Sequence, residues 1–143
     1  METNFNFKSQ ICTTREQSER LISLGLKKET ADMHYSYFGK NSKGEAMHYS
    51  EPFGGGPFSF DSPAWSLHRL IDTLPLLLRE GDNYSLIFDI HRDWVAYMAY
   101  ASGERNPYNR YLWESQNTNI YDAFIDCIEW LIKEGHFNKG YLV

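Results

Sequence analysis

The 143-residue sequence has few of the residues that mark secreted or metal-binding proteins. It contains only two cysteines, Cys12 and Cys127, which are too few for a disulfide framework, and no Cys-x-x-Cys pair. Its first ten residues contain no apolar signal region, and its longest apolar segment, 120–132, is interrupted by three acidic residues. These absences predict a cytoplasmic protein without a membrane span and without a cofactor.

Positive charge is also scarce. Lys and Arg number 14 against 19 Asp and Glu, which gives a formal net charge of −5 and a pI near 5.5. The densest basic clusters, Lys27-Lys28 and Arg105 with Arg110, do not form a stripe. Because proteins bind a phosphate backbone mainly through grouped Lys and Arg side chains, this composition disfavours nucleic-acid binding.

Aromatic residues, in contrast, are abundant: 10 Tyr, 9 Phe and 4 Trp make up 16% of the chain. Each ring can bury a large area, so a chain of this length can build a substantial hydrophobic core. Gly and Pro are too few for a collagen-like or low-complexity chain. We therefore expect one domain over residues 1–143, with residues 1–10 as a candidate disordered tail.

The first and last helices have clear end signals. Thr13 or Thr14 can cap the first helix, because each has a capping-box partner three residues later, and Gly25 can end it. The last helix is predicted over 120–134 and is ended by Gly135. Its polar residues form one narrow stripe, so its apolar surface must be covered on more than one side, by a sheet and by another helix or a second copy of the chain.

A second helix is predicted to begin after Asp61 or Ser62, with Pro63 at its first position, and to end at Pro75. Its spacing places four apolar residues on one face: Leu67, Leu70, Ile71 and Leu74.

Alternating aromatic and polar residues predict two β-hairpins. The first pairs 33–38 with 46–51 around the turn residues 40–44, and the second pairs 84–91 with 94–100. A two-residue turn at Arg92-Asp93 would place three facing pairs on one side of the second hairpin: Phe88 with Tyr97, Ile90 with Val95, and Leu86 with Ala99. Residues 110–113 are at best a short edge strand.

The element order is therefore helix, hairpin, helix, hairpin, helix. Strands that pair within hairpins form an antiparallel sheet, and no helical crossover joins single strands. The sequence predicts an α+β fold (α-ββ-α-ββ-α) whose antiparallel sheet is built from the two hairpins, with helices mainly on one face.

Two short motifs are similar to motifs of enzymes, but each lacks residues that the enzyme motif requires. Residues 89–93 contain the His-Arg-Asp of the protein-kinase catalytic loop, but Met98 occupies the place of the required Asn and no Gly-rich phosphate loop exists. Gly54-Gly55-Gly56 is not followed by the Lys and Ser or Thr of a phosphate-binding loop. The first motif is explained by a turn, and the second by a connection, a lid or a partner-binding loop.

The five histidines offer one possible metal pair, in the first hairpin. One register places His34 opposite Ser50 and diagonal to His48, whereas another places His48 opposite Tyr37 and separates the two histidines. The sequence does not choose between them. For nucleophilic catalysis, Cys127 lies among apolar helix residues, which disfavour a thiolate.

Three segments resemble a known group of proteins: SERL to GLKKETADM (18–33), PAWSL to LP (63–75) and YDAF to WLIKEG (121–135). They are similar to short proteins without an assigned activity that occur in gut anaerobes of the Bacteroides type and in their phages and mobile elements. The resemblance covers about half of the chain and implies an intracellular accessory protein. It assigns no functional residue.

Two functional hypotheses follow. The first is a non-enzymatic protein that binds an unidentified protein partner and forms a homodimer through the last helix; its self-association residues are Ile120, Phe124, Ile128 and Trp130. The alternative is a small ligand-binding domain or enzyme with a cleft near the Gly-rich loop and the hairpin histidines. The candidate ligand or partner surface consists of His34, His48, Phe53, Phe58, Trp65 and Trp113.

Overall fold

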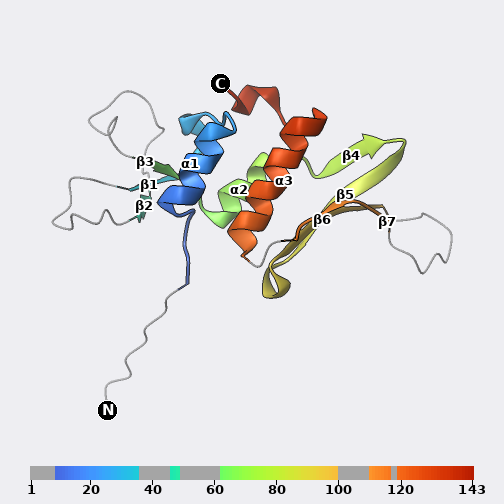
Figure 1. Ribbon diagram of the computed structural model, residues 1–143, viewed down its shortest axis with the longest axis horizontal. Helices are drawn as coiled ribbons and strands as arrows, with labels where there is room; N and C mark the ends of the chain where they lie inside the picture. Colours follow the sequence, from blue (N-terminus) through green and yellow to red (C-terminus); the bar gives the residue numbers. More distant parts are fainter. Residues whose placement is uncertain (1–8, 36–45, 49–61, 100–109, 117–118) are drawn as a thin grey trace, which may run out of the picture.

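The computed structural model describes residues 9–35, 46–48, 62–99, 110–116 and 119–143, with the backbone alone for 46–48. Within this part of the chain, three α-helices lie between two antiparallel sheets (Figure 1). The helices are α1 (Arg15–Ser23), α2 (Leu67–Thr73) and α3 (Ile120–Glu134). The predicted α+β class is confirmed.

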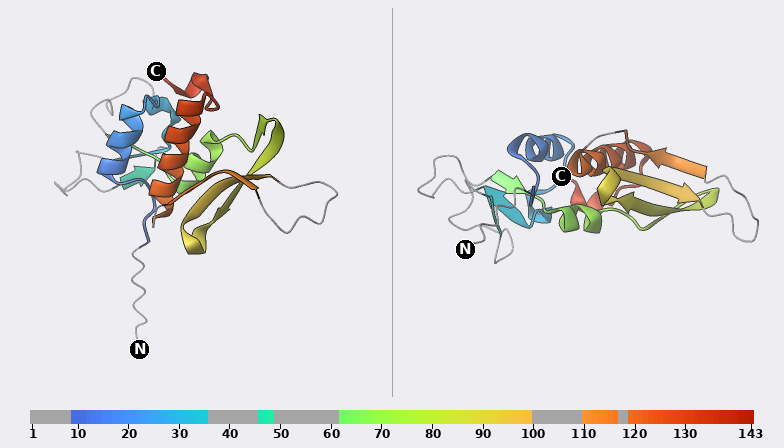
Figure 2. Two further views of the ribbon diagram at one scale, coloured as in Figure 1. Left: turned by 45° about the vertical axis from the view of Figure 1, so that its right-hand side comes forward. Right: turned by 90° about the horizontal axis from the view of Figure 1, so that it is seen from below.

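The two predicted hairpins belong to separate sheets and do not join into one. In spatial order, the three-stranded sheet contains β2 (Ala46–His48), β1 (Met33–Tyr35) and β3 (Ser62–Ala64). The four-stranded sheet contains β4 (Leu77–Glu80), β5 (Asp82–Asp89), β6 (Trp94–Ala99) and β7 (Arg110–Glu114). Figure 2 shows the sheets at opposite ends of the molecule, with the helices between them.

Helix α1 begins as its sequence predicts. Thr14 accepts a hydrogen bond from the Gln17 backbone N–H (3.1 Å), and the Gln17 side chain accepts one from the Thr14 N–H (3.0 Å), which completes a capping box. Gly25, at φ +101°, follows the helix end in a conformation that L side chains rarely adopt. Its carbonyl accepts a bond from the Val143 N–H (2.8 Å), so the turn after α1 holds the end of the chain.

The predicted start of the second helix is wrong. Residues 62–64 form β3, and α2 begins only after Ser66, whose side chain caps the Arg69 N–H. Long-range partners keep the preceding residues extended. The Trp65 carbonyl accepts a bond from the Thr13 N–H (2.8 Å), and the Trp65 N–H donates to the Thr13 hydroxyl (3.0 Å). The Asp32 carboxylate accepts bonds from the Ser66 N–H and hydroxyl. Local helix signals do not contain this information.

The second hairpin forms, but its turn is longer than predicted. A short 3₁₀ turn, Ile90–Arg92, and Asp93 in the left-handed region join β5 to β6. The added turn residues shift the register by two positions, so that Leu86 faces Tyr97 and Phe88 faces Val95. A two-residue shift keeps each side chain on its face, whereas Ile90 leaves the sheet and is exposed.

The first hairpin has neither of the two registers considered from the sequence. Met33 pairs with His48, and His34 pairs with Met47. Because successive positions of a strand alternate between the faces of a sheet, a residue opposite Met33 is out of phase with His34. The shared-face arrangement that a histidine pair needs is therefore not formed at these positions. The rest of this hairpin, with Tyr37 and Ser50, lies outside the described residues.

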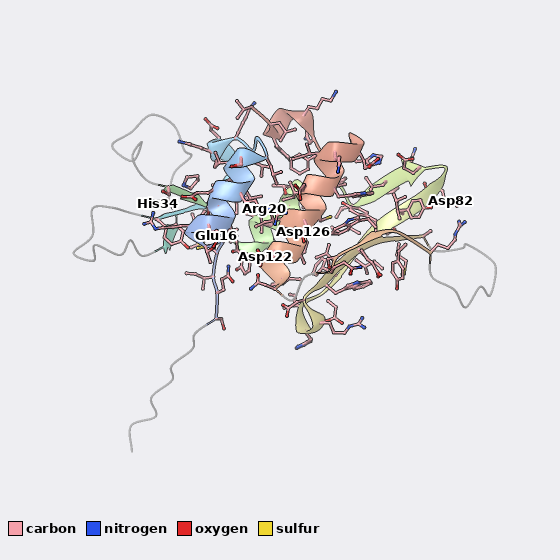
Figure 3. All side chains as sticks on the ribbon, viewed as in Figure 1. Glu16, Arg20, His34, Asp82, Asp122 and Asp126 are labelled. Carbon is pink, nitrogen blue, oxygen red and sulfur yellow. The ribbon has the colours of Figure 1, made fainter. Side chains whose placement is uncertain are left out.

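Helix α3 is the centre of the core, and one copy of the chain covers it. Its apolar side contacts β6 and α2, and its polar stripe faces α1. There, Arg20 binds Asp126 (2.6 Å) and Glu129 (2.8 Å), and Gln17 donates to Asp122 (2.9 Å). Figure 3 shows Arg20, Asp122 and Asp126 at this helix pair. The nearly encircling apolar surface is thus explained by intramolecular packing.

Candidate functional site

The two faces of the four-stranded sheet have different surroundings. The inner face packs on α3: the rings of Phe88 and Phe124 meet edge to face at 5.7 Å, and Tyr97 and Trp113 each contact the ring of Trp130. Tyr97 is fully buried, and its hydroxyl donates to the Pro75 carbonyl (2.7 Å). This face is an ordinary hydrophobic core.

The outer face carries both apolar and polar residues, and Figure 2 shows no described helix on it. Strand alternation places eleven residues there. Six are apolar or aromatic, Leu77, Ile87, Trp94, Ala96, Met98 and Tyr111, and five are polar or charged, Arg79, Asn83, Ser85, Asp89 and Glu114. None of them belongs to either buried core cluster of the described chain. A solvated face of an antiparallel sheet is normally polar, so the apolar residues of this face are informative.

An aromatic pair dominates this outer face. The rings of Trp94 and Tyr111 meet at nearly a right angle, 5.6 Å apart, and the Arg92 guanidinium lies 5.5 Å from the centre of the Trp94 ring. Between Trp94 and Met98 on the same strand lies Ala96, which is fully buried although it faces outward. Trp, Tyr and Arg are the side chains that most often dominate binding energy at protein interfaces.

An ion pair lies at one end of the outer face. Arg92 binds Asp89 (2.9 Å) beside the β5–β6 turn. The hydrogen bond from Arg92 holds the pKa of the Asp89 carboxyl below its ordinary value. The charged residues at this face, Arg79, Asp89, Arg92 and Glu114, carry both signs, so the face is not a site for a polyanion or a polycation.

A second polar cluster joins the N-terminal segment to β1 and β3. The Tyr35 hydroxyl donates to the Thr13 carbonyl (2.7 Å), and the indole N–H of Trp65 donates to the Thr30 hydroxyl (3.0 Å). The Thr13 and Ser18 hydroxyls are hydrogen bonded at 2.7 Å. These bonds hold segments together that are distant in the sequence, which is a structural role.

Neither cysteine has the environment of a nucleophile. Burial raises the pKa of the Cys12 thiol, although a hydrogen bond to Tyr35 opposes this effect. Burial also raises the pKa of Cys127 on α3, in agreement with its apolar neighbours in the sequence. Both thiols therefore remain protonated at neutral pH, and a protonated thiol is a poor nucleophile.

The described residues of the predicted ligand or partner surface are not brought together. Trp65 is fully buried and His34 nearly so, which removes both from an exposed surface. Trp113 lies on the inner face of the other sheet, stacked on Trp130 at 5.8 Å. His48 contributes only backbone to the description, and Phe53, Phe58 and the three glycines between them lie outside the described residues.

The predicted self-association residues lie inside the chain. Phe124 and Ile128 are fully buried, Ile120 is nearly so, and Trp130 packs between Tyr97, Trp113 and His136. A dimer through these side chains would require the core to open. The broad apolar surface of α3, which led to the prediction of a dimer, is covered by other parts of the same chain.

The described residues also lack two features that would indicate a function. They contain no group of three or more His, Cys, Asp or Glu side chains arranged to hold a metal ion. None of the described helices is both long enough and apolar enough to cross a membrane.

Sequence reasoning missed the outer-face residues that the structure singles out. Alternation in β5 and β6 identified the inner face correctly. In β6 the residues between the inner-face positions were informative as well, because Trp94, Ala96 and Met98 are all apolar where a solvated face would be polar. A strand that is apolar at both phases indicates that both of its faces are covered. In β5 the outer positions are mostly polar, and only Ile87 carries this signal.

Comparison with known proteins adds no family to this description, since no family model, curated protein or solved structure matches the chain.

Proposed function

We propose that the chain is a non-enzymatic protein-binding module and that its docking surface is the outer face of the four-stranded sheet. The observation that carries the proposal is the Trp94–Tyr111 pair, which stands with Leu77 and Ile87 on a face outside both core clusters. Tyr111 is 43% exposed and Leu77 is 42% exposed, so both side chains have apolar area to bury against a partner.

The chemistry of the face indicates the kind of partner. The face offers rings and aliphatic side chains, and its charged residues, Arg79, Asp89, Arg92 and Glu114, carry both signs. A folded protein with an apolar patch and few charges at its centre fits such a surface. Single-stranded nucleic acid also stacks on exposed rings, but it requires grouped cations beside them, and the net charge of −5 opposes it.

The test compares two substitutions of exposed apolar residues by lysine. Tyr111→Lys places a charge beside Trp94 on the outer face, whereas Ile11→Lys changes a residue that is 58% exposed in the N-terminal segment, away from this sheet. The tagged parent protein and both tagged variants are used to recover partners from a lysate of the organism that encodes the protein. A partner that is recovered is then purified, and its affinity for each protein is measured by calorimetry.

We expect the parent and Ile11→Lys to bind the purified partner equally well, and Tyr111→Lys to bind at least about 30-fold more weakly, the ~2 kcal/mol of an interface hot spot. Equal affinity of all three proteins would overturn the docking face. Recovery of nucleic acid in place of protein, or of no partner at all, would overturn the function itself.

A further inference from the structure

The two edges of the four-stranded sheet differ in how they are protected. At β7, the ladder to β6 contains a bulge between Tyr97 and Met98, and charged residues stand at both ends of the strand. Bulges and charges are devices that keep an edge from pairing with another strand. Strand β4, at the other edge, pairs with β5 in an unbroken register over all four residues.

The hydrogen-bond phase of β4 shows which of its backbone groups point outward. The Leu86 N–H donates to the Leu76 carbonyl (3.0 Å), which makes this facing pair a hydrogen-bonded one. In an antiparallel ladder such pairs alternate, so Leu78 and Glu80 also bond to β5. Leu77 and Arg79 therefore direct their N–H and C=O groups away from the sheet, and no described element lies beside them (Figure 1).

Exposed leucines accompany these outward backbone groups. Leu76 is 74% exposed and Leu77 is 42% exposed, at the start of the strand. An edge with free backbone groups and exposed apolar side chains is a template for another strand.

We propose that two copies of the chain pair antiparallel along β4, about a twofold axis at Leu78, and form one continuous sheet. In this register, Leu77 of each copy forms a hydrogen-bonded pair with Arg79 of the other, and each of the two pairs contributes two backbone hydrogen bonds. The aliphatic stem of Arg79 then covers the exposed Leu77 of the other copy.

Like-charge repulsion and the missing N–H of proline favour this register over those with the axis one residue away. An axis at Arg79 would place the two arginines directly opposite each other, which is destabilising. An axis at Leu77 would place Pro75 opposite Arg79, and Pro75 has no N–H, while its carbonyl already accepts the Tyr97 hydroxyl. With the axis at Leu78, only Leu76 and Glu80 face each other beyond the central pairs, and no like charges are opposite.

Pairing along β4 also enlarges the proposed docking surface. Four strands spaced ~4.8 Å apart, with a mean length of five to six residues, give an outer face of about 370 Å². Two copies in one continuous sheet present about twice this area on one side, close to the ~800 Å² per partner of a standard interface. The pairing itself does not depend on the proposed function, and it is tested by a different variant.

The test combines sedimentation velocity with amide hydrogen exchange on the purified chain, from micromolar to millimolar concentration. The parent is expected to become dimeric as the concentration rises. The N–H groups of Leu77 and Arg79 then exchange more slowly, about tenfold when nine tenths of the chain is dimeric. The N–H groups of Leu78 and Glu80, which already bond to β5, serve as internal controls whose exchange does not follow dimer formation.

Arg79→Pro removes one outward N–H and leaves the bonds to β5, because proline is tolerated on an edge strand where its nitrogen faces solvent. This variant is expected to remain monomeric with an unchanged circular dichroism spectrum. Arg79→Ala keeps the N–H and is expected to dimerise like the parent.

Three results would overturn the proposal: a parent that stays monomeric at every concentration, exchange at Leu77 and Arg79 that does not vary with concentration, or dimerisation of a folded Arg79→Pro variant. Protection of these amides only after addition of another protein would show that a foreign strand, and not a second copy, occupies the edge. A dimer that forms without protecting them would place the contact on another surface.

Discussion

The inner and outer faces of the four-stranded sheet both carry aromatic and aliphatic residues, but their surroundings differ. The inner face presents Tyr97 and Phe88 to α3: Tyr97 is fully buried, whereas Phe88 meets Phe124 edge to face and remains 39% exposed. The outer face presents Trp94, Tyr111 and Ile87, and Figure 2 shows no described helix on it. Apolar character alone therefore does not distinguish the face on which α3 packs from the face that it leaves uncovered.

The largest expected effect comes from the inner side of this comparison. Phe124 is fully buried on α3 and meets Phe88 edge to face, so Phe124→Ala leaves a cavity in the centre of the core. We expect the free energy of unfolding to fall by about 3–5 kcal/mol, measured by urea denaturation. A loss below about 1 kcal/mol would contradict the assignment of this face as the core.

Alkaline pH should destabilise the packing around α3, where Tyr97 and Tyr121 are buried. Burial raises the pKa of Tyr121 to about 12 and raises that of Tyr97 further, above the ordinary value near 10. The folded state thus favours the protonated phenols. Their contribution is complete below pH ~10 and is lost as the pH rises through the folded pKa, because the unfolded chain ionises first. We expect the free energy of unfolding to decline above pH ~10, by at most about 1.4 kcal/mol per pH unit for each tyrosine.

Replacement of Tyr97 by Phe separates this cause from the general effect of alkali. Tyr97→Phe removes one ionisable phenol and should make the decline above pH ~10 shallower than in the parent. An equally steep decline in this variant would show that the pKa of Tyr97 does not differ between the folded and unfolded states.

The smallest effect on stability is expected on the outer face. Trp94→Ala removes an edge-to-face ring pair worth about 0.5–1.5 kcal/mol. The urea midpoint should therefore move less than in Phe124→Ala. If Trp94→Ala destabilises the chain as strongly as Phe124→Ala, the outer face is a second core and the contrast between the faces disappears.

Much of the fold was accessible from local sequence signals. The last helix has the predicted range 120–134, because its apolar surface lies within that range and Gly135, at φ +77°, follows it directly. Thr14 with its capping box was one of two candidate caps, and the structure selects it over Thr13. Each of these features depends on residues within a few positions of one another.

Features that depend on distant partners could not be predicted in this way. The start of α2 is set by Asp32 and Thr13, which lie more than thirty residues away in the sequence. The register of β5 and β6 is set by the Asp89 side chain, which binds the His91 N–H and the Arg92 guanidinium and builds a longer turn. The outer face could be identified only once the position of α3 was known, because α3 shows which face of the sheet the chain itself covers.

The most direct test of the docking face is hydroxyl-radical footprinting of the chain, alone and in the complex reconstituted with its purified partner. The account predicts that labelling of Trp94 and Tyr111 falls in the complex, while labelling of Ile11 and Val143, which are exposed away from this sheet, stays unchanged. Protection of Ile11 or Val143, with Trp94 and Tyr111 labelled at their free rates, would contradict it.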